Sequence, residues 1–252
     1  MDKAVSDKVL VVTGGSRGIG RAVALRAARA GWRVCFSYVA AKDAADALVR
    51  EIEAAGGTAL AVRSDVALEA DIPALFKAAD GLGTLGGLVN NAGVVDYAAR
   101  VDEMTFARLH RMMTTNVIGS FLCAGEAVRR MSTRHGGQGG VIVNLSSVAA
   151  RLGAPNQYVD YAASKGAIDT FTTGLAGEVA EEGIRVTGVA PGLIETEIHA
   201  SGGQPDRLAR LSPLVPMKRA GTADEVASAI MWLLSDEASY ATGTTLTISG
   251  GR

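Results

Sequence analysis

The chain has 252 residues, with 25 basic and 26 acidic side chains and a net charge of −1. This balance, without a run of like charges, gives no reason to expect nucleic acid or an anionic membrane as a partner. No apolar run reaches the roughly 20 residues that a membrane-spanning helix needs, and the first ten residues, MDKAVSDKVL, lack the apolar core of a signal peptide. Cys35 and Cys123 lie in apolar stretches without C-x-x-C spacing, so we expect two small core residues in a cytoplasmic protein.

Hydrophobic periodicity divides the chain into alternating strands and helices. Strands are predicted at Val9–Val12, Arg33–Tyr38, Thr58–Arg63, Gly87–Asn90, Val141–Ser146, Ile184–Ala190 and Thr244–Ile248, and helices at Arg21–Ala30, Asp43–Ala55, Leu68–Ala79, Thr105–Arg130, Tyr158–Glu182 and Asp224–Leu234. The remaining stretch Pro191–Leu211 is expected to be irregular. This alternation predicts an α/β fold, a doubly wound parallel sheet with helices on both faces. No linker or repeat divides the chain, so residues 1–252 are expected to form a single domain.

The segment Lys8–Gly20, KVLVVTGGSRGIG, joins the first strand to the first helix. Its glycines Gly14, Gly18 and Gly20 permit a tight turn, a close approach of the backbone to a ligand, and close helix–strand packing. A strand, a glycine turn and a helix N-terminus together form a phosphate-binding arrangement. A structural turn before a helix has a similar pattern, but this context favours binding of a dinucleotide.

The carboxyl ends of parallel strands meet at one edge of a sheet, which is where a ligand is expected. Gly14, Tyr38, Asp65, Asn91, Ser147 and Pro191 follow the first six predicted strands. We therefore expect the functional site along this edge.

Tyr161 and Lys165 stand four residues apart on a predicted helix, so both project from one face. They could be an ordinary surface pair, or a phenol whose ionised form is stabilised by the ammonium group. Lowering a tyrosine pKa from about 10 to about 7 takes roughly 4 kcal/mol. One positive charge at about 4 Å contributes roughly 1 kcal/mol in water but roughly 4 at an effective dielectric of 20. Proton transfer by Tyr161 therefore requires a site from which water is partly excluded, and Ser147 could donate a hydrogen bond to a substrate oxygen there.

Seven motifs occur together and in order: TGGSRGIG (13–20), SDV (64–66), NNAG (90–93), NVIG (116–119), NLSS (144–147), YAASK (161–165) and APG (190–192). With the segment Pro216–Gly251, they make the whole chain resemble the short-chain dehydrogenase/reductase family in its single-domain, Rossmann-like branch. The resemblance implies an oxidoreductase that moves a hydride between a nicotinamide and a carbonyl or secondary alcohol.

The resemblance also assigns roles to individual residues. It implies that Tyr161 is the general acid/base, that Lys165 lowers the tyrosine pKa and holds the nicotinamide ribose, that Ser147 contacts the substrate oxygen, and that Asn116 holds a water connecting Lys165 to solvent. The residues implied to bind the cofactor, with those placed by strand ends, are Gly14, Ser16, Arg17, Gly18, Ile19, Gly20, Ser37, Tyr38, Asp65, Val66, Asn91, Ala92, Gly93, Pro191, Gly192, Ile194 and Thr196, besides Tyr161 and Lys165.

The end of the second strand bears on which dinucleotide binds. An acidic residue there would bond the adenosine 2′-OH and repel a 2′-phosphate, but no Asp or Glu occurs between Gly31 and Lys42. Arg17 can instead reach a 2′-phosphate, with Ser37 and Lys42 nearby. We expect NADP(H) to be preferred, with NAD(H) possible because Arg17 also occurs in NAD-using relatives.

Two adjacent serines precede Tyr161, and Ser147 lies fourteen residues before it, one more than in many relatives. The shorter spacing would fall on Val148, which has no hydroxyl. The NLSSVAA motif instead favours Ser147 over Ser146, with the extra residue absorbed in the turn Arg151–Gln157.

The substrate and the assembly stay open. The alternatives are a 3-oxoacyl-thioester reductase, a sugar-type dehydrogenase or a dinucleotide-sensing protein without turnover; sugar-nucleotide epimerases share the Tyr-x-x-x-Lys pair but usually have longer chains. The helices at 105–130 and 158–182 match the family's dimer faces and imply a homotetramer, with Gly119, Gly125, Gly166, Gly174 and Gly177 permitting close approach. His110, His135 and His199 lack metal-ligand spacing, so no metal site is expected.

Overall fold

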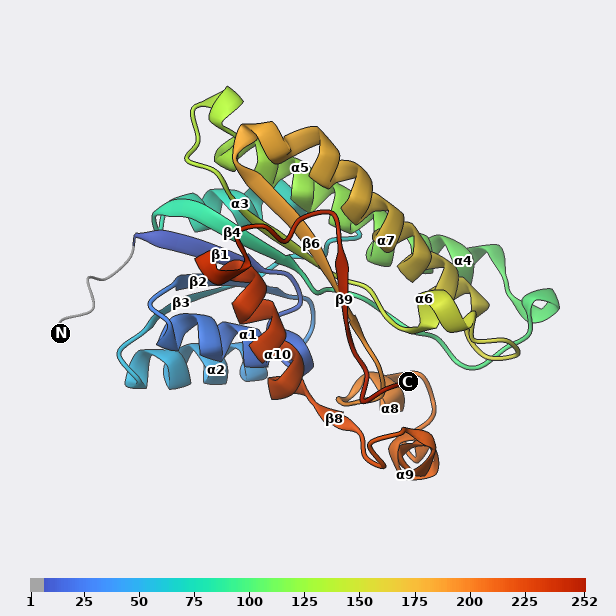
Figure 1. Ribbon diagram of the computed structural model, residues 1–252. Helices are drawn as coiled ribbons and strands as arrows, with labels where there is room; N and C mark the ends of the chain where they lie inside the picture. The colour runs from blue at the N-terminus through green and yellow to red at the C-terminus, as the bar shows by residue number, and fades with distance from the viewer. Residues whose placement is uncertain (1–6) are drawn as a thin grey trace.

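The computed structural model describes residues 7–252, apart from the side chain of His199, and contains one large parallel sheet (Figure 1). The strand order is β3-β2-β1-β4-β5-β6-β9. The strands are β1 (Lys8–Val12), β2 (Arg33–Tyr38), β3 (Thr58–Arg63), β4 (Thr84–Asn90), β5 (Gly140–Leu145), β6 (Ile184–Pro191) and β9 (Thr245–Ile248). The order reverses direction at β1, which pairs with both β2 and β4 and so places the topological switch point beside the glycine turn. The predicted doubly wound α/β fold is confirmed.

Helices cover both faces of the sheet (Figure 1). Side chains from α1 (Gly18–Arg29), α2 (Lys42–Ala54) and α10 (Ala223–Leu234) enter one apolar core, and those from α3 (Asp71–Asp80), α5 (Gly119–Met131) and α7 (Val159–Val179) enter the other. The apolar run of β1 is continuous because both of its faces are buried: Leu10 and Val12 face the first core, while Val9 and Val11 face the second. A strand covered on both faces has no solvent-exposed side to alternate with.

The single helix predicted over 105–130 is wrong in its middle. The structure has α4 (Phe106–Met113), a π-helical turn η2 (Thr114–Ile118) and then α5. Asn116, in the π turn, is buried and bonds the backbone of Val94 instead of facing solvent. Such widened turns occur mostly inside helices and frequently at functional sites.

The segment 191–211, expected to be irregular, contains short regular elements. A two-stranded sheet pairs β7 (Ile194–Glu195) with β8 (Gly221–Thr222), and α8 (Ile198–Ser201) and α9 (Arg207–Leu211) lie beside them near the C-terminus (Figure 1). A small core of Leu193, Val215 and Ala220, with Leu208 and Leu211 packed on it, holds this segment together. The expectation failed because each element is too short to show a hydrophobic period.

The remaining short elements are α6 (Ala149–Leu152) and the 3₁₀ turns η1 (Val101–Glu103), η3 (Thr133–His135), η4 (Ala180–Glu182), η5 (Ser212–Leu214) and η6 (Asp236–Ala238). The helix expected from Leu68 begins only at Asp71. Within the residues that the structure describes, no helix combines the length and the apolar character that crossing a bilayer requires.

Candidate active site

The glycine turn after β1 has the backbone geometry that only glycine adopts without strain. Gly14 and Gly18 have φ values of +64° and +53°, in the left-handed region. A Cβ on Gly20 would lie 2.5 Å from the carbonyl oxygen of Gly14 and 2.6 Å from Nδ2 of Asn91. The close contact of α1 with the turn therefore depends on the missing side chain.

Neighbouring strands hold this turn in place from behind. Gly14 N–H donates to Ser37 Oγ at 3.0 Å, and Asn91 Nδ2 donates to the carbonyl oxygens of Thr13 and Gly14 at 2.8 and 2.9 Å. The hydroxyl of Thr13 in turn accepts from the backbone N–H groups of Asn91 and Ala92. Ser37, expected beside a 2′-phosphate, is instead buried under the turn and supports it. Thr13 belongs to the TGGSRGIG motif, but its bracing role follows only from the tertiary contacts.

The N-terminus of α1 is open for an anion. Arg17 occupies the N-cap without a side-chain cap hydrogen bond, so the first amides of α1 lack both intrahelical and side-chain acceptors. The residues Gly18–Gly20 thus present N–H groups and the positive end of the helix dipole. Ser16 is buried in the turn, and Ile19 packs against the core below it. We call the turn 14–17 with these amides the cradle; its open N–H groups and helix N-terminus fit a diphosphate.

The far end of the cradle lies at the carboxyl ends of β2 and β3. Tyr38 ends β2 and is half-buried, and its carbonyl accepts from Ser64 N–H at 3.0 Å. Arg63, which ends β3 in register with Tyr38, donates from Nε to the Val39 carbonyl at 3.4 Å. Lys42 pairs with Asp46 on its own helix and so points along α2. Sequence reasoning missed Arg63, and its place directly before the SDV motif was the available signal.

Asp65 and Val66 form the loop after β3. Asp65 Oδ1 accepts from Ala67 N–H at 2.9 Å, and Asp65 N–H donates to Asp71 Oδ2 at 2.9 Å, which fixes the loop against the start of α3. Val66 is buried, and a Cβ on Gly119 would lie 2.7 Å from its carbonyl oxygen. Gly119 therefore makes a close contact within the chain and is buried there, instead of lying exposed on a helix face as expected.

Tyr161 and Lys165 lie on the first turns of α7 and share one face, as their spacing predicts. The Lys165 ammonium is 5.7 Å from the centre of the Tyr161 ring and donates to the Leu145 carbonyl at 2.6 Å. Burial raises the pKa of Tyr161, while a hydrogen bond with Ser147 and the charge of Arg207 oppose this rise. Burial lowers the pKa of Lys165 to about 8. Lys165 is buried and Tyr161 is half-buried, so the pair is partly sheltered from water, the condition that its proposed chemistry needs.

The two serines point in different directions. Ser147 is half-exposed and bonds Tyr161, whereas Ser146 is buried and donates to the Lys165 carbonyl at 3.2 Å. The turn expected to absorb the extra residue carries three positive φ values, at Gly153, Ala154 and Asn156. The chain thus makes a compact loop between α6 and α7, and Ser147 stays beside Tyr161.

Asn116 lies behind this pair. Its Oδ1 accepts from Val94 N–H at 2.8 Å, and its Nδ2 donates to the Val94 carbonyl at 3.0 Å and to Ser164 Oγ at 3.1 Å. A Cβ added to the neighbouring Gly93 would lie 3.4 Å from Asn116 Oδ1 and 3.6 Å from Lys165 Nζ. The π turn therefore joins the segment after β4 to Ser164 on α7.

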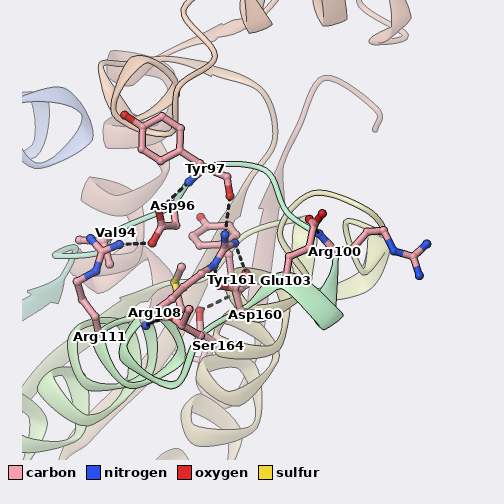
Figure 2. Close-up of polar contacts among 12 residues, drawn as sticks. Val94, Asp96, Tyr97, Arg100, Glu103, Arg108, Arg111, Asp160, Tyr161 and Ser164 are labelled. Atoms are coloured by element: carbon pink, nitrogen blue, oxygen red, sulfur yellow. Dashed lines mark hydrogen bonds and ion pairs between the residues drawn. The ribbon is translucent and has the colours of Figure 1, made fainter.

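A buried ion pair fixes the N-terminal turn of α7 (Figure 2). Arg108 on α4 donates to both carboxylate oxygens of Asp160, from Nε at 2.7 Å and from Nη2 at 3.1 Å. The side chain of Asp160 is 0% exposed and that of Arg108 is 11% exposed. Arg108 also donates to the Tyr97 carbonyl at 2.7 Å, and so it connects the segment after β4 to the residue that precedes Tyr161. The sequence carried no signal for this pair, whose members are 52 residues apart.

The segment after β6 faces the glycine turn. Pro191 ends β6, Gly192 N–H donates to the Ile248 carbonyl at 2.8 Å, and Ile194 is buried in β7. Thr196 lies at the mouth of the cradle, with its Cγ2 3.3 Å from the position of a Cβ on Gly18. Farther along, the Tyr97 ring packs directly on Gly203, leaving no space for a Cβ there. This segment therefore contacts both the glycine turn and the stretch after β4 that carries Tyr97.

The part of the chain that the structure describes contains no set of side chains arranged to bind a metal ion. No group of three or more His, Cys, Asp or Glu side chains gathers there in a way that could hold an ion. The side chain of His199 lies outside the description. Cys35 and Cys123 are buried, and burial raises the pKa of each thiol to about 12, so neither is a reactive thiolate.

Comparisons with known proteins agree with this architecture. A family model described as "Enoyl-(Acyl carrier protein) reductase" matches residues 14–252. An uncharacterized oxidoreductase of Escherichia coli, YgfF, is 52% identical over 245 residues, covering 97% of this chain and 99% of the relative.

Two solved structures are similar over the whole chain. A short-chain dehydrogenase/reductase from Serratia marcescens is 34% identical with a TM-score of 0.90 and coverage of 99% of both chains. A blue fluorescent protein from a metagenomic library, solved in complex with NADPH, is also 34% identical, with a TM-score of 0.89 and the same coverage. The chain belongs to the short-chain dehydrogenase/reductase family and is an NAD(P)-dependent oxidoreductase that acts on CH–OH groups.

Proposed function

We propose that this protein is an NADP(H)-dependent oxidoreductase that interconverts a carbonyl compound and a secondary alcohol, with Tyr161 as the general acid/base. The observation that carries the proposal is the half-buried Tyr161, whose hydroxyl is hydrogen-bonded to Ser147 and whose ring lies 5.7 Å from the buried ammonium of Lys165. When bound, the nicotinamide supplies the hydride for reduction and accepts it in oxidation.

The chain's own residues handle the proton and the substrate oxygen. Tyr161 gives its hydroxyl proton to the oxygen during reduction and takes it back during oxidation. Ser147 donates a hydrogen bond to that oxygen as negative charge develops on it. Lys165, charged at neutral pH with a pKa of about 8, favours the phenolate that remains on Tyr161. Asn116, which is hydrogen-bonded to Ser164, would hold the water that connects Lys165 to solvent.

The cradle at the sheet edge holds the dinucleotide. Gly14, Ser16, Arg17, Gly18, Ile19 and Gly20 would hold its diphosphate, and Tyr38, Asp65 and Val66 its adenosine, with Ser37 supporting the turn from below. Asn91, Ala92, Gly93, Tyr161 and Lys165 would hold the nicotinamide ribose, and Pro191, Gly192, Ile194 and Thr196 the nicotinamide. The bracing of the turn by Asn91 and the open N-terminus of α1 support this assignment.

The charge at the adenosine end favours NADP(H) over NAD(H). Arg17 is exposed at the N-cap of α1, and Arg63 lies beside the end of β2. Residues Val39–Ala41, which follow β2, carry no carboxylate that would repel a 2′-phosphate. The NADPH complex of the metagenomic relative supports the same preference. NAD(H) remains the weaker substrate in this proposal.

A homotetramer fits the outer face of α7. Gly166, Gly174 and Gly177 have no neighbour within 4 Å of an added Cβ, so a second copy could approach them closely. Ile118 and Phe121 are about half exposed beside them. We propose that residues 1–252 form one domain and that four copies associate through these helices in the cytoplasm. Light scattering that gives a monomer at micromolar concentration would contradict this assembly.

A 3-oxoacyl-thioester reductase and a sugar-type dehydrogenase are the alternatives of the same chemistry. The acyl carrier protein named by the matching family model favours the first. A dinucleotide sensor without turnover is a weaker alternative, because Ser147, Tyr161 and Lys165 are all in place.

The direct test measures NADPH and NADH oxidation by the purified protein with a panel of carbonyl compounds. Tyr161→Phe should lower turnover by about 10²–10⁴-fold while NADPH binding persists, because only the proton donor is removed. Tyr240→Phe is the matched control, since Tyr240 is fully exposed. Near-normal turnover in Tyr161→Phe would refute the assignment of Tyr161, and higher kcat/KM with NADH would refute the cofactor preference.

A further inference from the structure

A cationic side chain that the proposed reaction does not use lies near the start of α7, the helix that carries Tyr161. Arg207, the first residue of α9, places its guanidinium 5.2 Å from the centre of the Tyr158 ring. Tyr158 is the N-cap of α7, three residues before Tyr161, and is buried. Its hydroxyl accepts from Gln204 Nε2 at 2.7 Å. Arg207, Gln204, Gln157 and Tyr158 together form what we call the Arg207 cluster.

The hydrogen-bond partners of Arg207 are neutral amides. Its Nη1 donates to Gln157 Oε1 and to Gln204 Oε1, both at 3.0 Å. Across residues 7–252, with His199 aside, no ion pair to Arg207 is found, although it is half-buried. By contrast, Arg210 on the same helix reaches Asp206 at 4.0 Å. A partly desolvated guanidinium is a strong donor to an oxyanion, and amide oxygens are weaker acceptors.

The local electrostatics also favour an incoming anion. Burial lowers the pKa of Arg207, the nearby Tyr158 opposes this, and the positive charges of Arg252 and Arg210 lower it further. The positive charges of Arg207, Arg210 and Arg252 therefore lie near one another, and Asp206 is the carboxylate paired with Arg210. The charge of Arg207 is felt at Tyr161, whose pKa it lowers against the larger effect of burial. An anion bound by Arg207 would thus lie close to the reacting group.

The position of the cluster makes it part of the substrate side. It belongs to the segment after β6, where Gly203 packs on the Tyr97 ring, while Tyr97 is tied through its carbonyl to Arg108 and Asp160. Figure 2 shows Arg108 joining the Tyr97 carbonyl to the Asp160 carboxylate, next to Tyr161 in the chain. Arg207 therefore lies near Tyr161, on a segment that also packs against Tyr97.

We propose that Arg207 binds a carboxylate of the substrate, so that the natural substrate is an oxo or hydroxy carboxylic acid. This inference rests on the proposed carbonyl–alcohol chemistry and specifies its substrate class. The planar guanidinium can take a carboxylate through two parallel hydrogen bonds, in exchange for the amide oxygens of Gln157 and Gln204. The bound carboxylate orients the carbonyl toward Tyr161 and Ser147.

The test compares acids with their neutral esters at an unchanged reacting carbonyl. Pyruvate, acetoacetate and levulinate place the carboxylate progressively farther from the carbonyl, and each is assayed with NADPH beside its methyl ester. For at least one pair, kcat/KM should be higher for the acid. Arg207→Gln should lower the acid-to-ester ratio of kcat/KM by about 10- to 100-fold, the range expected for a hydrogen bond to a charged group. Arg207→Lys should restore part of the acid-to-ester ratio, because lysine carries the positive charge but cannot form the two parallel hydrogen bonds of a guanidinium.

The exposed Arg134, on η3, supplies the matched control, and Arg134→Gln should leave the ratio unchanged. Equal kcat/KM for acid and ester in all pairs, or an unchanged ratio in Arg207→Gln, overturns the inference and leaves the proposed function intact, because ester turnover itself demonstrates the oxidoreductase. Absence of NADPH oxidation with acids, esters and the neutral carbonyl panel alike overturns the proposed function and this inference with it.

Discussion

Removing the buried carboxylate that precedes Tyr161 should destabilise the protein far more than removing an exposed one. Asp160 is 0% exposed and is held by two hydrogen bonds from Arg108, itself 11% exposed. Asp160→Ala leaves the guanidinium buried without its counter-charge. Stranding one member of a buried pair typically costs about 3–5 kcal/mol in the free energy of unfolding. We expect a loss of that size for Asp160→Ala.

An exposed ion pair of the same chain gives the scale for comparison. Lys42 and Asp46 form an i,i+4 pair on α2 with side chains 68% and 39% exposed. Asp46→Ala should cost only about 0.2–1 kcal/mol, because water screens the charges and solvates the lysine that remains. The ratio of the two losses, measured in one protein, isolates the effect of burial.

A double variant separates the stranded charge from lost packing. Arg108→Met combined with Asp160→Leu removes both charges and fills much of the same volume. It should recover a large part of the stability lost in Asp160→Ala, since no buried charge is left unpaired. If the double variant is as unstable as the single one, the loss arises from packing or from the Tyr97 contact of Arg108 and not from the unpaired charge.

Urea unfolding followed by the fluorescence of Trp32 and Trp232 measures these free energies. All variants are compared at one protomer concentration, because association shifts apparent stability by mass action. A loss for Asp160→Ala below about 1 kcal/mol, no larger than that of a surface pair, would refute the reasoning.

Two further predictions concern Ser147 and Lys165. Ser147→Ala should lower turnover by about 10²–10³-fold, the loss expected for one donor to a developing oxyanion, and Ser146→Ala should lower it much less because that hydroxyl bonds the Lys165 carbonyl; the reverse ranking in steady-state kinetics would show that Ser146 is the substrate-facing serine. Burial lowers the pKa of Lys165 from 10.5 to about 8, so the unfolded chain binds this proton more tightly than the folded chain. Below about pH 8 the buried charge therefore lowers the free energy of unfolding, and this loss fades as the pH rises toward 10.5. Lys165→Met should therefore raise the free energy of unfolding at neutral pH by up to about 3 kcal/mol, with the gain shrinking in alkaline buffer, and a pH-independent difference in urea titrations would contradict the cause.

Local patterns in the sequence were sufficient for the sheet and for the residues at its carboxyl edge. Continuous apolar runs such as Val9–Val12 predict strands covered on both faces, and the structure confirms them with side chains alternating between two cores. Gly14, Gly18 and Gly20 predict a turn that only glycine allows, because their conformation and contacts depend on the backbone itself. The four-residue spacing of Tyr161 and Lys165 places them on one helix face for the same local reason.

Tertiary structure alone decided what contacts those residues make. The π turn places the Asn116 side chain in hydrogen bonds with Val94, a contact that helix periodicity does not encode. Arg63 beside β2, Arg108 on Asp160 and Arg207 over Tyr158 are likewise pairings between distant segments. A long cationic side chain has the same local pattern whether water, a carboxylate or a ring surrounds it, so its partner follows only from how the segments pack.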